Sequence, residues 1–441
     1  SYGLVSSFVL LYLTGTLGLD SAIIGSLMLA SKVLDGISDV IFGTLIDRTH
    51  SKLGKARPWM LFGQVGVSLC LFLLFAIPAG STTMQYIYFF IVYTALNAVF
   101  YTANGIAYSS LVALITKNNN ERVQLGSFRF MFAVVTNIFM GFAVTGMVEK
   151  FGSGAAGWRT TALIFAIVGL VVNTISCLAV KELPEEELSD NTSEAVEEGK
   201  AVAKEKKHGF AETTKILIHN KYYLMILAIY IVYYIMSNLT TGAGVFCATY
   251  YWGDGSLLGQ FSMMKMFPVI IALAIAPVLI KKTGSMQKVN FWGYAISSVL
   301  GIPMIYFAMQ KNLSMFLLFM FIKGIFAGTL SGSLNALIAE ASGYTTRTTG
   351  IHMDGMMYSC SSLGVKVGGG IGTAAVGWLL KLGGFVGTAT VQSESAIRMI
   401  FNLYITFPFV IGIIITVLLA FLDVEKANKK WDAEHQKEVQ A

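Results

Sequence analysis

Charged residues are scarce in this sequence. Asp, Glu, Lys and Arg make up 13% of the 441 residues, whereas hydrophobic residues make up 55%, and the mean hydropathy is +0.66. An ordinary soluble domain has about a quarter charged residues, and a soluble protein of this composition would expose large apolar patches. The composition therefore excludes an ordinary soluble domain and indicates an integral membrane protein.

Cysteine clusters and enzyme motifs are also lacking. The four cysteines lie in separate apolar runs, at Cys70, Cys177, Cys247 and Cys360, and no two have the spacing of metal ligands. No HExxH, GxSxG or Walker motif is present. We therefore expect neither an enzyme nor a bound cofactor. The net charge of +6 lies mainly between apolar runs, which indicates membrane topology rather than a nucleic-acid partner.

Long hydrophobic runs dominate what is present. A spanning helix needs about 20 mainly apolar residues, and the runs lie near 1–18, 21–46, 58–79, 84–116, 123–148, 159–180, 220–250, 256–280, 288–308, 313–340, 350–381 and 396–422. We predict an all-α membrane protein with twelve transmembrane helices in two six-helix bundles. The predicted parts are a first bundle whose first span lacks its start, a polar linker, a second bundle and a polar tail, at residues 1–181, 182–217, 218–422 and 423–441.

Basic residues predict the orientation. They cluster in the connection between spans 2 and 3, in that between spans 8 and 9, and in the linker. All three segments fall on one side of a twelve-span topology, which the positive-inside tendency makes cytoplasmic. The protein is expected in a cell membrane, with the linker and tail in the cytoplasm. "LIDRTHSKLGKARPWMLFG" and "LIKKTGSMQKVNFWG" form a weak repeat, as parallel half-repeats of a transporter would.

The second span carries ionisable side chains in its middle. Asp35 and Asp39 are four residues apart and share a helix face with Lys32 and Ser38. Each charge at mid-membrane costs about 2.5–3.5 kcal/mol on insertion scales. The three charges sum to −1, which a bound cation or a proton on one carboxyl would neutralise. The alternative is a structural ion-pair network between helices.

The stretch "LDGISDVIFGTLIDRTHSKLGKARPW" resembles the signature of the glycoside–pentoside–hexuronide:cation symporters, the melibiose-carrier branch of the major facilitator superfamily. "SSLGVKVGGGIG" in the eleventh span adds to the resemblance, which extends over essentially the whole chain. Val40 stands where the family pattern has Pro. The resemblance implies the major facilitator fold and cation-coupled sugar transport.

Site residues follow from the resemblance by position. Asp35 and Asp39 match the carboxylates of the family's cation site, Ser38 lies at a further polar position, and Thr102 matches a hydroxyl ligand of sodium-coupled members. This match favours Na⁺ over H⁺. Lys366 matches an intramembrane lysine that would bring positive charge towards the cation site.

Lys32 matches a basic family position beside the cation site. Gly105 stands where melibiose-type members carry an acidic sugar ligand, so sugar recognition must differ here.

Candidate substrate residues lie in spans 4 and 5. Tyr101, Asn104 and Tyr108 share one helix face and offer an amide and aromatic surfaces for a sugar; helix packing is the alternative. Arg129 could hold a carboxylate in a bidentate pair or snorkel to the interface. Lys366 is a further candidate substrate contact.

Three further features carry weaker hypotheses. Arg347 and Asp354 are candidate gating residues at the cytoplasmic start of span 11, with a solvated helix end as the alternative. Lys265 and Lys323 could each line the cavity, but for both we expect snorkelling. Gly364, Gly368 and Gly372 form a small-residue stripe that predicts close helix packing.

The sequence thus predicts a symporter that couples Na⁺ or H⁺ to the uptake of a glycoside by alternating access. Because the acid of span 4 is missing and Arg129 and Lys366 are basic, an anionic sugar such as a glucuronide or hexuronate is the favoured substrate. The alternatives are neutral pentosides or oligosides, lysolipids, and a receptor or scaffold that does not transport. We expect a monomer in the lipid bilayer.

Overall fold

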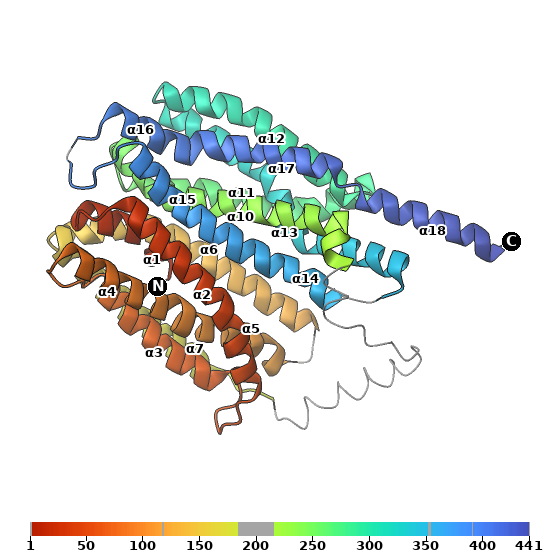
Figure 1. Ribbon diagram of the computed structural model, residues 1–441, viewed down its shortest axis with the longest axis horizontal. Helices are drawn as coiled ribbons and strands as arrows, with labels where there is room; N and C mark the ends of the chain where they lie inside the picture. Colours follow the sequence, from red (N-terminus) through yellow and green to blue (C-terminus); the bar gives the residue numbers. More distant parts are fainter. Residues whose placement is uncertain (1, 117–118, 184–215, 352–353, 390, 441) are drawn as a thin grey trace. The chain divides into compact units, whose positions relative to one another are not determined.

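A computed structural model gives the structure of residues 2–116, 119–183, 216–351, 354–389 and 391–440 (Figure 1). The predicted linker lies largely outside these described residues. The chain divides into two compact units, one of residues 1–207 and 386–389 and one of residues 208–385 and 390–441. Each unit is described by itself.

Every regular element of the described part of the first unit is helical, and the π-helical segments are labelled η. The elements are α1 (Tyr2–Leu11), η1 (Tyr12–Thr16), α2 (Ser21–Asp47), α3 (Arg57–Leu74), α4 (Thr82–Thr94), η2 (Ala95–Tyr101), α5 (Thr102–Ile115), α6 (Asn119–Lys150) and α7 (Gly154–Ala179).

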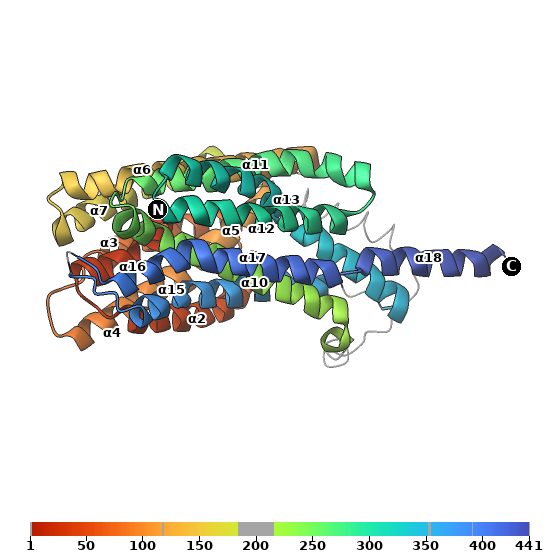
Figure 2. The ribbon, with the colours of Figure 1, turned by 90° about the horizontal axis from the view of Figure 1, so that it is seen from above.

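The described part of the second unit is helical as well. Its elements are α10 (Lys221–Phe246), η4 (Cys247–Tyr251), α11 (Leu257–Thr283), α12 (Met286–Met309), α13 (Leu313–Thr349), α14 (Asp354–Leu363), η5 (Gly364–Gly368), α15 (Gly369–Leu382), α16 (Glu394–Phe401), η6 (Asn402–Thr406), α17 (Phe407–Phe421) and α18 (Val424–Gln440). Helices α11, α12 and α13 pack against one another and lie side by side (Figure 2).

The helices account for the predicted spans. Within the described residues, ten helices are long and apolar enough to cross a bilayer, and Tyr2–Thr16 is a shorter apolar helix. The charged helix α2 has 27 residues and completes a set of twelve. The prediction of an all-α membrane protein is confirmed. The predicted polar tail proves to be largely one helix, α18.

Polar side chains fix where several helices begin. The Asp20 carboxylate accepts hydrogen bonds from the backbone N–H groups of Ala22 and Ile23 at the start of α2, and Asn220 does the same at the start of α10. Such caps satisfy donors that have no partner inside the helix. The apolar runs therefore begin as helices at defined residues.

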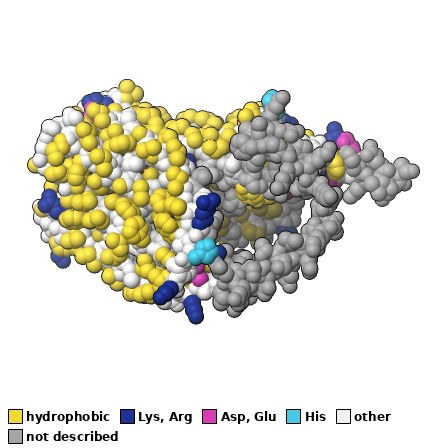
Figure 3. All heavy atoms as spheres, turned by 60° about the horizontal axis from the view of Figure 1, so that its bottom comes forward, with side chains coloured by type: hydrophobic (Ala, Val, Ile, Leu, Met, Phe, Trp, Pro, Cys, Tyr) yellow, Lys and Arg dark blue, Asp and Glu magenta, His cyan; other side chains and the backbone are white. Residues whose placement is uncertain are grey.

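Hydrophobic side chains cover the outside of the helices. Figure 3 shows one face that is largely hydrophobic, with Lys, Arg and His side chains near its edges. On α3, Phe62, Val65 and Leu69 are 65%, 54% and 56% exposed, at the spacing of one helix face. A surface of this kind suits contact with lipid and not with water.

The glycine stripe of the eleventh span allows close packing, as the sequence predicted. An added Cβ at Gly368 would overlap the Ile231 carbonyl oxygen of α10, and one at Gly372 would lie 2.6 Å from the Ile235 carbonyl oxygen. Helix α10 therefore approaches η5 and α15 with almost no side chain between the backbones.

The weak sequence repeat has a structural counterpart. Glu182 follows α7, and its carboxylate accepts hydrogen bonds from the N–H groups of Lys55, Ala56 and Arg57 at 2.7, 3.0 and 2.9 Å, where α3 begins. In the second unit, the Glu425 carboxylate accepts from the N–H groups of Met286 and Gln287, where α12 begins.

In each unit, then, a glutamate after the last span caps the third span. A carboxylate at a helix N-terminus also interacts favourably with the helix dipole.

Candidate functional site

The ionisable residues of α2 lie on one face of the helix. Asp35 is 6% exposed, whereas Val33 and Ile37, on the opposite face, are 61% and 58% exposed. The chain thus turns its charges towards protein and its apolar side chains outward. This arrangement is expected for charges at membrane depth.

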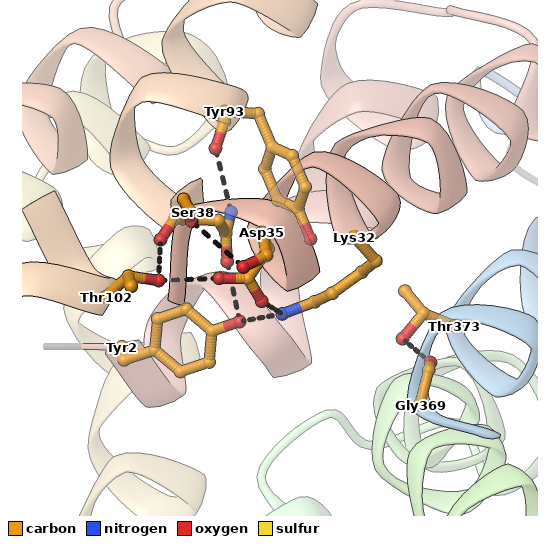
Figure 4. Close-up of polar contacts among 9 residues, drawn as sticks. Tyr2, Lys32, Asp35, Ser38, Tyr93, Thr102, Gly369 and Thr373 are labelled. Carbon is orange, nitrogen blue, oxygen red and sulfur yellow. Dashed lines mark hydrogen bonds and ion pairs between the residues drawn. The ribbon is translucent and has the colours of Figure 1, made fainter. Parts of the chain in front are cut away.

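Asp35 contacts a hydroxyl and an ammonium group (Figure 4). Its Oδ1 accepts a hydrogen bond of 2.6 Å from the Thr102 hydroxyl of α5, and its Oδ2 lies 3.5 Å from the Lys32 ammonium. A charge-assisted hydrogen bond from a hydroxyl to a carboxylate is expected at about 2.5–2.7 Å. The pairing neutralises the charge of one buried carboxylate.

A second set of contacts holds Lys32 in place. The Lys32 ammonium donates to the Tyr2 hydroxyl at 3.2 Å, which in turn donates to Asn97 Oδ1 at 2.8 Å. The Asn97 amide donates to the Tyr93 carbonyl at 2.8 Å. Residues of α1, α2, α4 and η2 are therefore joined in one polar network (Figure 4).

The π-helical segment η2 places Thr102 at this network. Besides its bond to Asp35, the Thr102 hydroxyl lies 2.9 Å from the Asn97 carbonyl, five residues earlier. A hydroxyl has one proton, so Thr102 donates to one of these acceptors at a time. Short π-helical segments inside α-helices are frequent at functional sites.

The other predicted cation ligands lie on α2 as well. Asp39 is half-buried on the face that carries Asp35. The Ser38 hydroxyl donates to the Asp35 backbone carbonyl at 2.9 Å, which is a common local bond within a helix. Both residues therefore lie beside Asp35, and their roles as ligands stay predictions.

Two aromatic residues of the candidate substrate face contact the polar network or Arg129. Tyr101 stacks on Tyr2, with ring centroids 4.1 Å apart. Tyr108 lies under the Arg129 guanidinium, whose central carbon is 4.4 Å from the ring centroid, and Arg129 donates to the Ser109 hydroxyl at 3.1 Å. The guanidinium is thus held against α5, and it has further N–H groups that can donate to a ligand.

Asn104 has different neighbours. Its amide donates to the Met60 carbonyl of α3 at 2.8 Å, and Asn173 of α7 donates to the same carbonyl at 3.1 Å. These contacts are those of helix packing, the alternative noted for this residue. A role of Asn104 in substrate binding stays a prediction.

The remaining candidates belong to the second unit. Lys366 lies in η5, and its predicted contribution to the cation site stays a prediction. The Arg347 guanidinium bonds to both carboxylate oxygens of Asp432 in α18, at 2.9 and 3.3 Å. The partner of Arg347 is therefore on the C-terminal helix; the side chain of Asp354 lies outside the described part.

Sequence reasoning missed two members of the network, Tyr2 and Asn97. Both are uncharged polar residues within apolar runs, where Tyr and Asn are common. Neither has a charge that marks it as unusual in a membrane span. They could have been found only by asking which polar side chains contact Lys32. The sequence does not answer this question, because the contacts depend on how the helices pack.

Comparison with known proteins decides the family. Residues 1–426 match the MFS/sugar transport protein family. The chain belongs to the MFS/sugar transport protein family. It is therefore a membrane transporter and not an enzyme, and the resemblance noted in the sequence is confirmed.

Two relatives are similar to this chain over more than four fifths of their own length. The isoprimeverose transporter of Lactiplantibacillus pentosus is 26% identical over 445 residues, which cover 100% of this chain and 89% of that protein. The glucuronide carrier protein homolog of Escherichia coli (strain K12) is 23% identical, with 88% and 81% covered.

A solved structure supports the fold. The crystal structure of a D-xylose-proton symporter has a TM-score of 0.60, with 12% identity, and 95% of each chain is covered. This likeness, together with the family match, confirms the predicted major facilitator fold.

Proposed function

We propose that this transporter couples the inward movement of a monovalent cation to the uptake of a glycoside by alternating access. The observation that carries the proposal is the buried Asp35 carboxylate with the Thr102 hydroxyl at 2.6 Å and the Lys32 ammonium at 3.5 Å. A carboxylate and a hydroxyl are hard oxygen ligands suited to such a cation. The names of the relatives, an isoprimeverose transporter and a glucuronide carrier homolog, support a sugar as the passenger.

The coupling ion of this proposal is Na⁺. Lys32 occupies the Asp35 carboxylate when no ion is bound, and Na⁺ replaces it, with Asp39 supplying a second carboxylate. A proton on Asp35 would displace Lys32 equally well. The two ions differ in what they need from Thr102, because only Na⁺ requires the lone pairs of its hydroxyl.

The two ligands are coupled through their affinities. Binding of the cation favours binding of the sugar by some factor, and the sugar favours the cation by the same factor. The loaded carrier then changes between its outward and inward states around a site near the midplane, as in transporters built from repeats.

Counterflow in proteoliposomes tests the proposal. A panel of neutral glycosides and glucuronides is measured with and without Na⁺, for the wild type and for Asp35→Asn. We expect Na⁺-dependent uptake in the wild type and its loss in the variant. Asp254→Asn is the matched control, because Asp254 is an exposed loop residue that accepts a backbone hydrogen bond at 2.8 Å, which Asn also accepts.

If no sugar is carried but lysolipids are, the proposed substrate class is wrong.

Thr102→Val separates Na⁺ from H⁺. Valine keeps the shape but removes the oxygen, so we expect the half-saturating Na⁺ concentration to rise at least tenfold. Thr161→Val is the control, because Thr161 is 0% exposed and its hydroxyl has no hydrogen-bond partner among the described residues. An unchanged Na⁺ requirement in Thr102→Val would contradict Na⁺ coupling.

The finer form of the proposal is an anionic glycoside, with Arg129 as the residue that meets its carboxylate. Tyr108 and Ser109 hold the guanidinium, and a bidentate pair with a carboxylate is geometrically specific. Arg129→Gln is expected to lower uptake of a glucuronide and to spare a neutral glycoside. Uptake of neutral sugars alone, unaffected by this change, favours the neutral alternative.

The proposed location is the cell membrane, with the basic loop before α3, the linker and α18 on the cytoplasmic side. Arg48, Lys52 and Lys55 in that loop, and Arg57 at the start of α3, support this orientation. The proposed working form is a monomer.

A further inference from the structure

The second unit has a partly open cavity with two lysines in its lining. Lys265 of α11 and Lys323 of α13 both line it, together with residues of α10, α12, η6 and α17. Its volume is about 180 Å³. The expectation that these lysines snorkel to the interface is therefore wrong: both face this interior space.

Close packing of α11 against α13 brings the two lysines to one cavity. An added Cβ at Gly324, next to Lys323, would lie 2.8 Å from Pro268 Cβ, and one at Gly328 would lie 2.6 Å from Ala272 Cβ. Lys265 is eight residues into α11 and Lys323 ten residues into α13. At the rise of an α-helix these positions are about 12 and about 15 Å from the helix starts, so both lie deep in their spans.

The two ammonium groups have different surroundings. Lys265 donates to the hydroxyls of Thr240 and Thr241 in α10, at 3.0 and 3.1 Å. Lys323 makes no hydrogen bond or ion pair with the described residues. One cation is thus fixed in position, and the other is left without a counter-charge.

No carboxylate of the neighbouring helices can neutralise them. The sequence has no Asp or Glu between Lys221 and Gly253, or between Leu257 and Ala339, which includes α10, α11 and α12 entirely. Charged side chains at membrane depth are costly unless they are paired, and they mark ligand pathways. The lining therefore has two positive charges and lacks the negative charge that would balance them.

A third donor lines the same cavity. Tyr294 of α12 is 2% exposed, and its hydroxyl has no hydrogen-bond partner among the described residues. A buried donor without a partner costs free energy. Tyr233 and Ser331, also in the lining, satisfy each other at 2.7 Å. Of the groups left over in the lining, Lys323 can only donate, and the Tyr294 hydroxyl can donate or accept, so Lys323 requires an acceptor.

We infer that this cavity binds an oxyanion, held by Lys265, Lys323 and the Tyr294 hydroxyl. An engineered cavity of about 150 Å³ binds benzene, so the volume of about 180 Å³ here limits the enclosed part of the ligand to a small group such as a carboxylate and the atoms next to it. The ligand class is a sugar acid of monosaccharide size, a hexuronate. Binding of an oxyanion in this cavity does not rest on the proposed symport. Transport of this ligand as the substrate does rest on it, and the cavity then replaces Arg129 as the site that binds the substrate carboxylate.

Thermal unfolding of the purified protein tests the site directly. The probes are D-glucuronate, D-glucose as its neutral counterpart, and inorganic phosphate. We expect glucuronate to raise the melting temperature of the wild type and glucose not to. Lys265→Met and Lys323→Met should each weaken the binding of glucuronate at least tenfold, and Tyr294→Phe should weaken it less. Lys288→Met is the control, because Lys288 is exposed at the start of α12.

A second readout guards against a general loss of structure. Without any anion, Lys323→Met should melt at a higher temperature than the wild type, because it removes a buried charge that has no partner. A wild type stabilised by phosphate and not by glucuronate assigns the site to a free inorganic anion; stabilisation by glucuronate assigns it to a sugar acid. The inference is overturned if neither anion binds, if glucose binds as well as glucuronate, or if the double lysine variant binds normally.

A different variant tests the proposed symport, so failure of one proposal can be told from failure of the other. Asp35→Asn should lose Na⁺-dependent transport and still bind glucuronate.

Discussion

Lys32 pairs with the Asp35 carboxylate, which a bound cation would also need as a ligand. Its ammonium lies 3.5 Å from Asp35 Oδ2 and is held there by the Tyr2 hydroxyl. Lys32→Met removes this competitor and leaves the carboxylate to the cation. We expect the half-saturating Na⁺ concentration for transport to fall about tenfold, which corresponds to about 1.4 kcal/mol.

Two companion variants complete this experiment. Tyr2→Phe keeps the ring stacked on Tyr101 but removes the bond to Lys32, so a smaller shift in the same direction is expected. Lys288→Met should leave the Na⁺ requirement unchanged. A higher Na⁺ requirement in Lys32→Met would show that the lysine helps to build the cation site instead of competing for it.

The sequence predicted the charged members of this site and Thr102, but not Tyr2 or Asn97. Lys32 and Asp35 stand out because ionisable residues are rare in an apolar run, and Thr102 was assigned by resemblance. The structure brings all three together. The sequence could not reveal that Asn97 accepts from Tyr2, because this contact depends on how α1, α2 and η2 are rotated against one another.

At the scale of elements, one glutamate holds the start of a helix in each unit. Glu182 accepts from three backbone N–H groups before and at the start of α3, and Glu425 accepts from two at the start of α12. Replacing a capping residue with Ala typically costs about 0.5–2 kcal/mol. Glu182→Ala and Glu425→Ala should each lower the melting temperature by a few degrees.

Glu434→Ala is the matched control for these caps. Glu434 pairs with Lys430 at 3.8 Å, and both side chains are largely exposed, so the pair contributes little. If Glu182→Ala and Glu425→Ala melt at the same temperature as the control Glu434→Ala, neither cap stabilises its unit.

In the glycine stripe, we expect a Gly→Ala change to lower stability, although helix propensity alone predicts that it would raise stability. Alanine is favoured over glycine in a helix by about 1 kcal/mol, so Gly146→Ala in α6, where an added Cβ has nothing within 4 Å, should be neutral or stabilising. Gly368→Ala should instead destabilise, because its Cβ would overlap the Ile231 carbonyl. Thermal unfolding of both variants measures the difference, and stabilisation by Gly368→Ala would contradict the packing of α10 against η5.

Elements were easier to predict than their irregularities. Apolar runs of the right length gave the spanning helices, and the glycines at every fourth position gave the close contact of α10 with η5. The π-helical segments were not predicted, because one extra residue in a helical turn does not change the composition of an apolar run. The helix α18 was missed because its residues, such as Lys429 and Lys430, read as a polar tail.

At the scale of the molecule, the basic loops predict which side faces the cytoplasm. The four native cysteines are buried, so single introduced cysteines report on accessibility. Lys52→Cys, before α3, should react with a membrane-impermeant thiol reagent only from the cytoplasmic side. Lys311→Cys, between α12 and α13, should react only from the outside. Labelling of both from one side would contradict the topology.

The second span and the second half of the sequence differ in the sign of their net intramembrane charge. The second span has a net charge of −1, from Lys32, Asp35 and Asp39, whereas the second half carries Lys265, Lys323 and Lys366. The sequence alone showed this difference and the two groups of six spans. It could not show that Lys265 and Lys323 line one cavity, because they are 58 residues apart in the chain and meet through the packing of α11 against α13.

The contacts of the candidate cation site come from residues 2–102, and the lining of the lysine cavity comes from residues 233–412. No side chain is shared, so each can be altered while the other is left intact. Asp35→Asn and Lys323→Met therefore form a double-mutant cycle, with glucuronate affinity measured at high Na⁺ concentration. The departure from additivity in that cycle is an interaction free energy. It would measure how strongly the cation site and the anion site depend on each other in binding.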